Sequence, residues 1–568
     1  MTGPVFPIIL RRMRGPLLAV ITAYALGMVV LMAIPGVTDD GEPWRMTFLH
    51  AFYFLTYTAP TIGFGEIPHE YTDAQRLGYL VAIYLPVISW FYALVTIIGL
   101  VQDPFFRQAV TEARFQRQVR RIADPFWIVC GYGDTGALLV RSMTDRGVVV
   151  TVVDRDQSRI EDLATRGLRT FVPGLYGDAN STVTLNAAGL NLPNCQGVLS
   201  VTGDDHTNLH VAITVRLLRP SLRVLCRADH RSTAANMASF GTDHIINPFE
   251  TFADRLALAI TSPEMHRVFE WLSGMPNTPL VERPQPPKGR WLVCGYGRFG
   301  KAVCRQFDRI GAEYTVIEQM PERAGAPDEG TIHGKGTEAV TLREAGIESA
   351  AAVLAGTADD ADNLSIVMTS RDLQPDLFLT ARENQLANKP LFKAARLQLP
   401  VEPSYIIATR MLSLITAPLL PEFLRIARGF DRSWHARLAE RIREVSGGVV
   451  PDIWTLEISE SASPTVVDLR ESGHEVRIRH IAIDPHGGGE GVNALLLLLV
   501  RSEGVVPLPD MEVVLEPGDR LLFCGTEDAH AQMNWTLFHR NTLRFLVTGE
   551  QRPDGIVWRW LARRRNAA

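Results

Sequence analysis

The sequence predicts a membrane α-helical domain of the two-helix pore-loop type plus α/β domains, namely two tandem Rossmann-like doubly wound domains and a small C-terminal α+β domain. This prediction is based on two uncharged apolar segments near the N-terminus, an internal repeat, and short alternating apolar runs after residue 445. A chain of 568 residues is too long for one domain. We expect a pore domain with its linker at 1–125, doubly wound domains at 126–275 and 290–445, a C-terminal domain at 446–530, and a tail at 531–568.

The apolar segments at residues 17–34 and 77–101 contain no charged residue, and each is long enough to cross about 30 Å of hydrocarbon. Between them, residues 44–58 are apolar and aromatic but too short to span, which favours a re-entrant helix. Arginines precede the first segment and follow the second, whereas the intervening loop is acidic. We therefore expect a multi-pass protein of the cell (inner) membrane with both termini cytoplasmic.

The segment that follows the re-entrant helix, Thr61-Ile62-Gly63-Phe64-Gly65, is predicted to be an ion-selectivity filter. A dehydrated potassium ion needs a ring of oxygens, and four copies of this segment would supply stacked backbone carbonyls. The glycines permit backbone angles that a side chain forbids. One copy cannot form a pore alone, so several subunits are expected in the bilayer. The alternative is a glycine-rich turn in a soluble protein.

An internal repeat organises the rest of the chain. Residues 128–136 (IVCGYGDTG) recur at 292–300 (LVCGYGRFG), and residues 204–209 (DDHTNL) recur at 359–364 (DDADNL). Each copy alternates short apolar runs with amphipathic stretches, which predicts βαβ units and a parallel sheet. In the first copy we expect strands within residues 127–133, 148–154, 197–203, 223–229 and 244–248.

Each copy opens with a glycine motif typical of nucleotide binding. The first glycine makes a tight turn, the second admits a pyrophosphate, and the third allows close helix packing, with phosphate on the helix N-terminus. About twenty residues on, a carboxylate that ends the second strand is placed to accept hydrogen bonds from ribose hydroxyls. The predicted binding residues are Gly131, Tyr132, Gly133, Asp134, Thr135, Gly136, Asp154 and Arg155 in the first copy, and Gly295, Gly297, Gly300 and Glu318 in the second.

The carboxylates also bear on which nucleotide binds. A carboxylate at this position repels a 2′-phosphate, so NAD or another adenine nucleotide is favoured over NADP as the regulatory ligand. Arg155 follows Asp154 directly and weakens that inference, because it could contact a phosphate. The alternative for either copy is a fold that binds nothing.

No arrangement of residues predicts an enzyme or a metal centre. The six cysteines are scattered without paired metal spacing, and a net charge of −5 gives no sign of nucleic-acid binding. His206 and His210 beside Asp204 could bind a metal, but an Asp-capped helix start is favoured. Residues 359–362 contain three aspartates that could take a calcium ion, although capping is again favoured there.

The combination resembles prokaryotic two-helix potassium channels with tandem RCK domains of the TrkA-N type and a C-terminal RCK-C domain of the TrkA-C type. Residues 61–65 resemble the filter consensus Thr-Val-Gly-Tyr-Gly, with Pro60 where that family usually has Thr or Ser, so the strictness of potassium selectivity stays open. Residues 516–525 look like the last strands of RCK-C. Asp178 lies in a Gly-Asp-Ala turn that matches the family's turn near the nucleotide, whereas the second copy has Lys335 there.

This resemblance implies a ligand-gated potassium channel. It would be a homotetramer whose eight RCK domains form a cytoplasmic gating ring that pulls on the pore-lining helix when nucleotide binds. Two alternatives remain, a membrane-anchored NAD-dependent oxidoreductase and a regulatory subunit of a separate potassium transporter. The first does not explain the filter segment, and the second would need no filter of its own.

Overall fold

The computed structural model describes residues 5–65, 69–484 and 491–549. Residues up to Ala123 make up one compact unit, and the residues from Asp124 onward make up nearly all of the other. The first unit contains α1 (Val5–Ala33), β1 (Gly36–Val37), β2 (Pro43–Trp44), α2 (Phe48–Thr58), α3 (Asp73–Gln102) and α4 (Pro104–Arg120).

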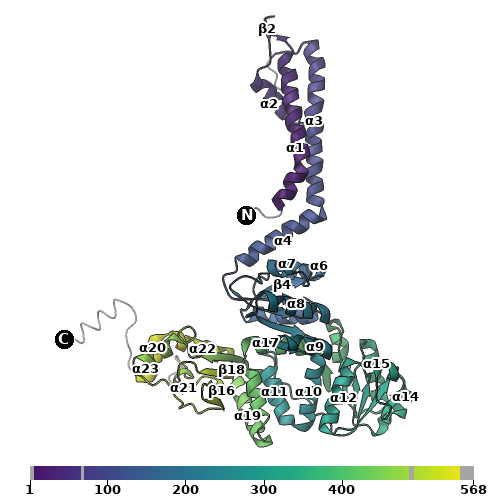
Figure 1. Cartoon of the computed structure of the whole chain (residues 1–568), viewed down its shortest axis with the longest axis vertical. Coiled ribbons are helices and arrows are strands. Elements are labelled where there is room, and N and C mark those ends of the chain that lie inside the picture. Colours follow the sequence, from purple (N-terminus) through teal and green to yellow (C-terminus); the bar gives the residue numbers. More distant parts are fainter. Residues whose placement is uncertain (1–4, 66–68, 485–490, 550–568) are drawn as a thin grey trace, which may run out of the picture. The chain divides into compact units, whose positions relative to one another are not determined.

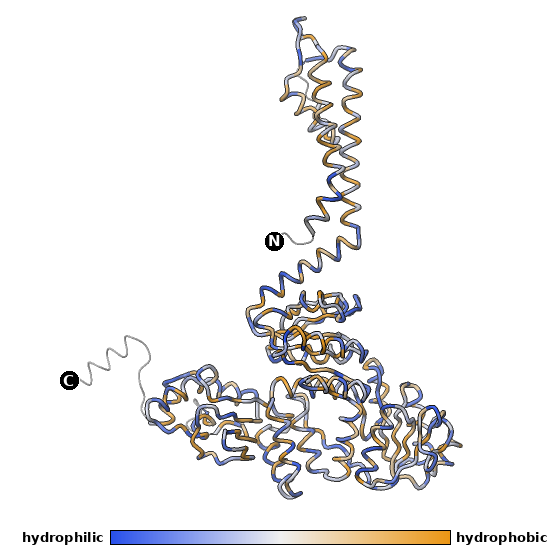
Figure 2. The backbone as a smooth tube through the Cα atoms, in the orientation of Figure 1, coloured by the Kyte–Doolittle hydropathy of each residue, from blue (hydrophilic) through white to orange (hydrophobic). Residues whose placement is uncertain are grey.

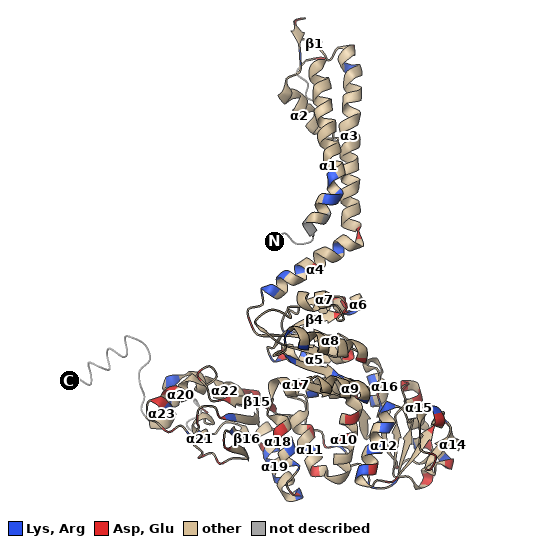
Figure 3. Ribbon diagram, in the orientation of Figure 1, with Lys and Arg blue, Asp and Glu red and all other residues tan. Residues whose placement is uncertain are grey.

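Two helices of the first unit are long and apolar enough to cross a membrane, α1 over Ile9–Ala33 and α3 over its full length of 30 residues. Figure 2 shows both as largely hydrophobic, and Figure 3 shows α3 almost without charge. The two predicted spans are confirmed. The expected re-entrant helix is α2, which begins later than expected because Thr47 caps it by accepting a hydrogen bond from the amide of His50 at 3.3 Å.

The C-terminal end of the second span is set by Asp103. Its carboxylate accepts hydrogen bonds from the amides of Phe105 and Phe106 and so caps α4, while Pro104 is the first residue of that helix. Arg12 of α1 lies 2.6 Å from the same carboxylate. These backbone hydrogen bonds and Arg12 hold the pKa of Asp103 below its usual value. One residue therefore ends α3, starts α4 and ties both to α1.

The first α/β domain is a six-stranded parallel sheet in the order β5-β4-β3-β6-β7-β8. This order is that of a doubly wound dinucleotide-binding fold. Its elements are β3 (Phe126–Cys130), α5 (Asp134–Asp145), β4 (Val149–Asp154), α6 (Gln157–Thr165), β5 (Gly174–Tyr176), α7 (Thr182–Ala187), β6 (Cys195–Ser200), α8 (Asp205–Leu218), β7 (Arg223–Arg227), α9 (Arg231–Ser239), β8 (His244–Ile246), α10 (Pro248–Thr261) and α11 (Pro263–Ser273).

The second α/β domain repeats this sheet in the order β11-β10-β9-β12-β13-β14, again all parallel. The prediction of two tandem doubly wound domains is thus confirmed. The elements are β9 (Trp291–Cys294), α12 (Arg298–Ile310), β10 (Tyr314–Glu318), α13 (Pro321–Ala324), β11 (Thr331–His333), α14 (Ala339–Glu344), η1 (Ile347–Ser349), β12 (Ala352–Ala355), α15 (Asp360–Leu373), β13 (Phe378–Arg382), η2 (Leu386–Asn388), α16 (Lys389–Ala394), β14 (Leu399–Val401), α17 (Pro403–Thr416), α18 (Leu420–Ala427) and α19 (Arg432–Ser446).

The two domains exchange helices. Phe252 and Leu256 of α10, which follows the first sheet, are buried in the core of the second domain with Trp291. Conversely, Met411 of α17, which follows the second sheet, is buried in the core of the first domain with Leu139 of α5. Each domain therefore completes the hydrophobic core of the other. Helices α17 and α18 together are apolar enough to count as a third candidate span, bent by 107°. Their apolar residues are instead buried in protein cores, those of α17 in the first domain and those of α18 against α11 and α19.

The C-terminal domain is a four-stranded antiparallel sheet in the order β15-β18-β16-β17 with helices against it. The predicted α+β class is confirmed. Its elements are β15 (Asp452–Glu457), α20 (Pro464–Glu471), α21 (Ile478–Ile481), β16 (Ala494–Arg501), β17 (Gly504–Pro507), β18 (Arg520–Gly525), α22 (Glu527–Phe538) and α23 (Arg540–Thr548). The Arg-rich end of the predicted tail, residues 559–565, lies outside the described residues.

Two of the alternating apolar runs after residue 445, at 477–483 and 512–517, do not form strands. In the first run, Ile478–Ile481 form the single turn α21, because the His480 ring accepts a hydrogen bond from the Arg477 amide at 3.0 Å and closes the turn. Residues 512–517 lie in a loop that meets this turn through one isolated bridge between Arg477 and Val514. Ile478, Ile481 and Leu515 are buried in the core of the C-terminal domain, where the turn packs against the loop.

Candidate pore and nucleotide site

The predicted filter has an alternating backbone. Thr61, Gly63 and Gly65 have φ values of +61°, +66° and +71°, whereas the intervening Ile62 and Phe64 do not have positive φ. In an ordinary strand successive carbonyls point to opposite sides, so inverting the handedness at every second residue turns them toward one side. A positive φ is strained for a β-branched residue such as Thr61 and is typical of functional sites. This backbone suits a line of carbonyls along an axis.

The end of the re-entrant helix holds the filter. The carbonyl of Tyr57 accepts hydrogen bonds from the amides of Ile62 at 2.9 Å and Gly63 at 3.2 Å. The ring of Tyr57, which is buried, lies edge-on to Phe64 with centroids 6.1 Å apart. The last turn of α2 therefore anchors the start of the predicted filter.

Pro60 stands between this helix and the filter and lacks an N–H group that could brace it. We expect Pro60→Thr to raise the ratio of potassium to sodium permeability by roughly fivefold at most, the effect of one added hydrogen bond of about 1 kcal/mol. Reversal potentials under bi-ionic conditions measure this ratio. A ratio that stays the same, or falls, contradicts the prediction.

The glycine loop of the first α/β domain is tightly packed. Gly131 has a φ of +100°, and a Cβ atom there would lie 3.0 Å from the backbone of Thr202. A Cβ atom on Gly136 would lie 1.9 Å from the carbonyl oxygen of Gly131. The first and third glycines are thus required by the turn and by the approach of α5, as the sequence predicts. Gly133 precedes α5, and no side chain caps that helix. Its first N–H groups are therefore available to a phosphate.

The carboxylate of Asp154, which is buried, clamps this loop. It accepts hydrogen bonds from the amide of Tyr132 and, at 2.8 Å, from that of Asp156. The second domain repeats the arrangement, because Glu318 accepts from the amides of Tyr296 at 2.7 Å and Met320 at 3.0 Å. The predicted ribose-binding carboxylates therefore also hold their own glycine loops, a role that the sequence did not reveal.

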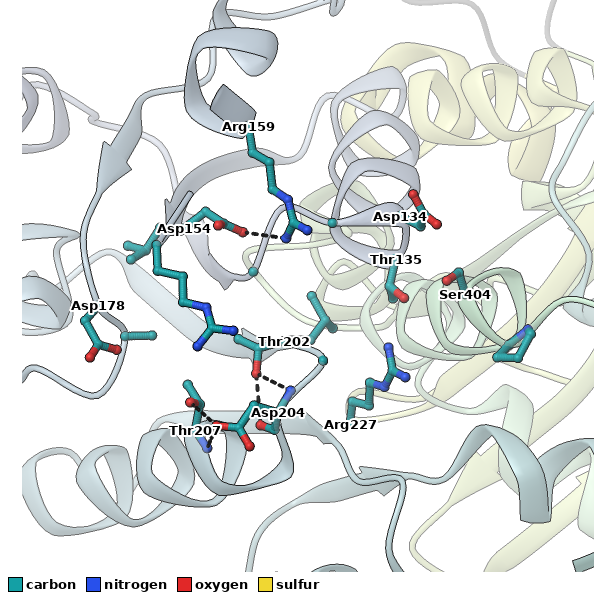
Figure 4. Close-up of a pocket in the computed structure, with 18 of the residues that line it drawn as sticks. Asp134, Thr135, Asp154, Arg159, Asp178, Thr202, Asp204, Thr207, Arg227 and Ser404 are labelled. Carbon is teal, nitrogen blue, oxygen red and sulfur yellow. Dashed lines mark hydrogen bonds and ion pairs between the residues drawn. The ribbon is translucent and has the colours of Figure 1, made fainter. Parts of the chain in front are cut away.

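A pocket of about 300 Å³ opens beside the first glycine loop (Figure 4). Seven residues predicted for this site line it, namely Gly131, Gly133, Asp134, Thr135, Asp154, Arg155 and Asp178. Tyr132 does not line it, because its side chain is buried in the core of the domain, and Gly136 does not because it lies within α5. The glycine cradle, the uncapped helix and the carboxylate beside them suit a nucleotide.

Several lining residues were not predicted. Arg159 of α6 extends over the glycine loop and lies 3.6 Å from the carboxylate of Asp154, and Figure 4 shows it above Thr202. Other unpredicted residues include Thr202, Asp204, Thr207 and Arg227 from the first domain, and Arg382, Asn384, Pro403 and Ser404 from the second domain. Pro403 and Ser404 start the exchanged helix α17, whereas Arg382 and Asn384 lie at and after the end of β13, and sequence spacing does not indicate that these parts of the second domain meet the first.

The second glycine loop has the same backbone but different surroundings. Gly295 has a φ of +97°, and a Cβ atom on Gly300 would lie 2.0 Å from the carbonyl oxygen of Gly295. Arg298 replaces Asp134 of the first copy and lies 3.4 Å from the His230 ring. Lys335, in place of Asp178, is exposed. Weaker nucleotide binding at Gly295, Gly297, Gly300 and Glu318 stays a prediction.

The acidic pairs have structural partners. Asp204 caps α8 and Asp359 caps α15, each by accepting hydrogen bonds from two backbone amides. Their neighbours fasten the loops after β7 and β13, since Asp205 accepts from the His230 amide and Asp360 from the Asn384 amide. Capping accounts for these residues, as the sequence favoured. Within the described ranges, no three His, Cys, Asp or Glu side chains are grouped to hold a metal ion.

Glu383 is buried at 4% exposure near the carboxylates of Glu402 and Asp360, and its Oε2 atom has no hydrogen-bond partner among the described residues. Burial, helped by Glu402, raises the pKa of Glu383 to about 7. Between the unfolded pKa and about pH 7 the unfolded chain releases a proton that the folded chain keeps. The contribution of Glu383 to the free energy of unfolding is therefore fully present below the unfolded pKa, and it is lost as the pH rises through about 7.

Glu383→Gln removes this ionisation. We expect the variant to melt at a higher temperature than the unmodified chain at pH 8 and at a similar temperature at pH 5. Thermal unfolding at the two pH values measures the difference. An equal difference at both pH values contradicts the raised pKa.

Comparisons with known proteins agree with this geometry. Residues 18–102 match the family model described as an ion channel, and residues 127–248 and 291–403 match that of the TrkA-N domain. The chain joins an ion-channel domain to two TrkA-N domains. The identity of the domain after residue 446 rests on the earlier resemblance to RCK-C and is a proposal.

Individual relatives are distant. The chain is 24% identical over 246 residues to an uncharacterized protein of Methanothermus fervidus, covering 43% of this chain and 37% of that protein. It is 21% identical over 249 residues to potassium channel protein 1 of Methanocaldococcus jannaschii, covering 44% of this chain and 70% of that one. Among solved structures, the GsuK channel bound to NAD aligns with 94% of this chain and 99% of its own, at 16% identity and a TM-score of 0.47.

Proposed function

We propose that the chain is one subunit of a homotetrameric, ligand-gated potassium channel of the cell (inner) membrane with both termini cytoplasmic. The backbone of residues 61–65 carries this proposal, because positive φ at every second residue aligns carbonyls for a dehydrated ion. This segment follows a re-entrant helix between two membrane-spanning helices. One chain supplies one wall of such a pore, so four chains complete it.

The regulatory ligand of this channel is an adenine nucleotide, with NAD foremost, held in the pocket of the first TrkA-N domain. The glycine loop and the uncapped start of α5 would hold phosphate, and Asp154 would contact the ribose. Asp359, from the group that suggested calcium, and Asp204, from the group that suggested a metal, are engaged as helix caps. A nucleotide is therefore favoured over calcium as the ligand of the gating ring.

In this proposal the cytoplasmic ring couples nucleotide binding to opening of the pore. A ligand shifts a gate only by binding the open and closed forms with different affinity. Helices α10 and α17 each pack in the core of the other TrkA-N domain. A conformational change in one domain therefore alters the packing of the other. The C-terminal domain, which we assign to the RCK-C type, packs its sheet on α11, α18 and α19 of the same ring unit.

Purified protein in liposomes tests this function. We expect potassium flux that exceeds sodium flux and needs no second protein. An NAD-dependent oxidoreductase would give no flux and would oxidise or reduce the nucleotide. A regulatory subunit would give flux only when its transporter is added. Absence of flux from protein shown to be assembled overturns the proposal.

A further inference from the structure

Arg382 of the second TrkA-N domain lines the pocket of the first domain, where the carboxylates of Asp229 and Asp360 attract it only at longer range. Its guanidinium forms no hydrogen bond or ion pair with any described residue, and its Nε is buried. The guanidinium carbon lies 4.6 Å from the ring centroid of Phe249 on α10, which orients it. A partly buried guanidinium that lacks a direct ion pair is stabilised when an anion joins it.

The internal repeat supplies a comparison. The matching arginine of the first copy, Arg227, forms a two-point pair with Asp229, in which Nε and Nη2 each lie 2.8 Å from a carboxylate oxygen. The residue that matches Asp229 in the second copy is Asn384. Its side chain donates to Asp360 at 2.8 Å and does not pair with Arg382. One arginine of the repeat thus has a direct carboxylate partner within its domain, whereas the other lines the pocket without a direct ion pair.

A second feature at the same place favours an anion. Helix α17, with 14 residues, begins at Pro403 and has no side-chain cap, because its N-cap Glu402 makes no capping hydrogen bond. Pro403 and Ser404 of its first turn line the pocket, and Figure 4 shows Ser404 and Thr135 of α5 on the same side of it. Two uncapped helix starts therefore reach one pocket, whereas α8 is capped by its own Asp204.

We propose that Arg382, with the first turn of α17, forms a second phosphate subsite that the second domain contributes to the nucleotide pocket of the first. One phosphate lies on the glycine loop and α5, and the next lies between Arg382 and α17. The ligand is thus a nucleoside diphosphate or a dinucleotide, and a monophosphate leaves the second subsite empty. Such a ligand bridges the two domains. This inference rests on nucleotide binding as proposed above.

Calorimetric titration of the full chain in detergent with AMP, ADP and NAD tests the subsite. We expect ADP and NAD to bind at least ten times more tightly than AMP, since Arg–phosphate pairs are strong charge-assisted contacts. In Arg382→Gln, ADP affinity should fall by ten- to a hundredfold and AMP affinity by less than twofold. Asn384→Asp, which restores the carboxylate of the first copy, should reduce ADP affinity in the same way while keeping Arg382.

The matched control is Arg343→Gln on the exposed face of α14, which should leave all three affinities unchanged. Equal affinities for AMP and ADP in the unmodified chain overturn the subsite and need no variant to fold. Equal losses for AMP and ADP in Arg382→Gln also overturn it, while nucleotide binding itself stands. If none of the three nucleotides binds, the proposed regulatory ligand fails and the subsite fails with it.

Discussion

Replacing Gly63 by alanine is expected to abolish potassium flux. Gly63 has a φ of +66°, which an L-residue adopts at a cost of about 1–2 kcal/mol. A Cβ there would meet nothing within 4 Å in its own subunit, so the effect arises from the backbone. Relaxing toward negative φ would turn a carbonyl away from the axis in all four subunits. Flux of potassium from proteoliposomes measures the loss.

Gly41 offers a matched control for this substitution. It also has positive φ, +87°, with nothing within 4 Å of a Cβ, but it lies in the turn between β1 and β2. Gly41→Ala should carry similar backbone strain and retain flux. Both variants should elute as tetramers in size-exclusion chromatography. If Gly63→Ala conducts as well as Gly41→Ala, residues 61–65 are not the conduction path.

Asp154→Ala is expected to weaken nucleotide binding by about 1.5–3 kcal/mol, the effect of losing hydrogen bonds to a charged group. This corresponds to a roughly ten- to hundredfold rise in Kd. Two causes combine, the lost contact with ribose and the loss of the hydrogen bonds that hold the glycine loop at Tyr132 and Asp156. Calorimetric titration with NAD and ADP measures the change.

Glu318→Ala is the control for the second of these causes. Glu318 clamps the second glycine loop in the same way, through Tyr296 and Met320, but it does not line the pocket. We expect it to lower thermal stability about as much as Asp154→Ala and to change nucleotide affinity much less. Equal losses of affinity in the two variants would move the main binding site away from the first domain.

The spans and most strands of the first domain could be predicted because their residues alone decide them. An uncharged run of membrane length has few alternatives, and buried parallel strands appear as continuous apolar runs. Strand β5, Gly174–Tyr176, was missed since three residues with a glycine carry no such signal. Its place is fixed by pairing with β4, which is a tertiary interaction.

Only part of the pocket lining, all of it from the first domain, could be predicted, because the rest depends on tertiary interactions. A glycine motif and a carboxylate twenty residues on are local signals, and they gave six lining residues, while the family resemblance gave the seventh, Asp178. The contribution of Arg382 and Ser404 depends on which core the apolar face of α17 enters, and an amphipathic helix does not specify its partner. The matching helices after each repeat, which begin at Pro248 and Pro403, were the available hint of a reciprocal exchange.

The most direct test of the account is the open probability of single channels in a planar bilayer, with NAD or ADP added on the side of the cytoplasmic domains. We expect a potassium-selective current whose open probability changes with nucleotide, and Asp154→Ala should shift the required concentration at least tenfold while leaving ion preference unchanged. A potassium current with the same open probability at zero and saturating nucleotide would contradict nucleotide gating.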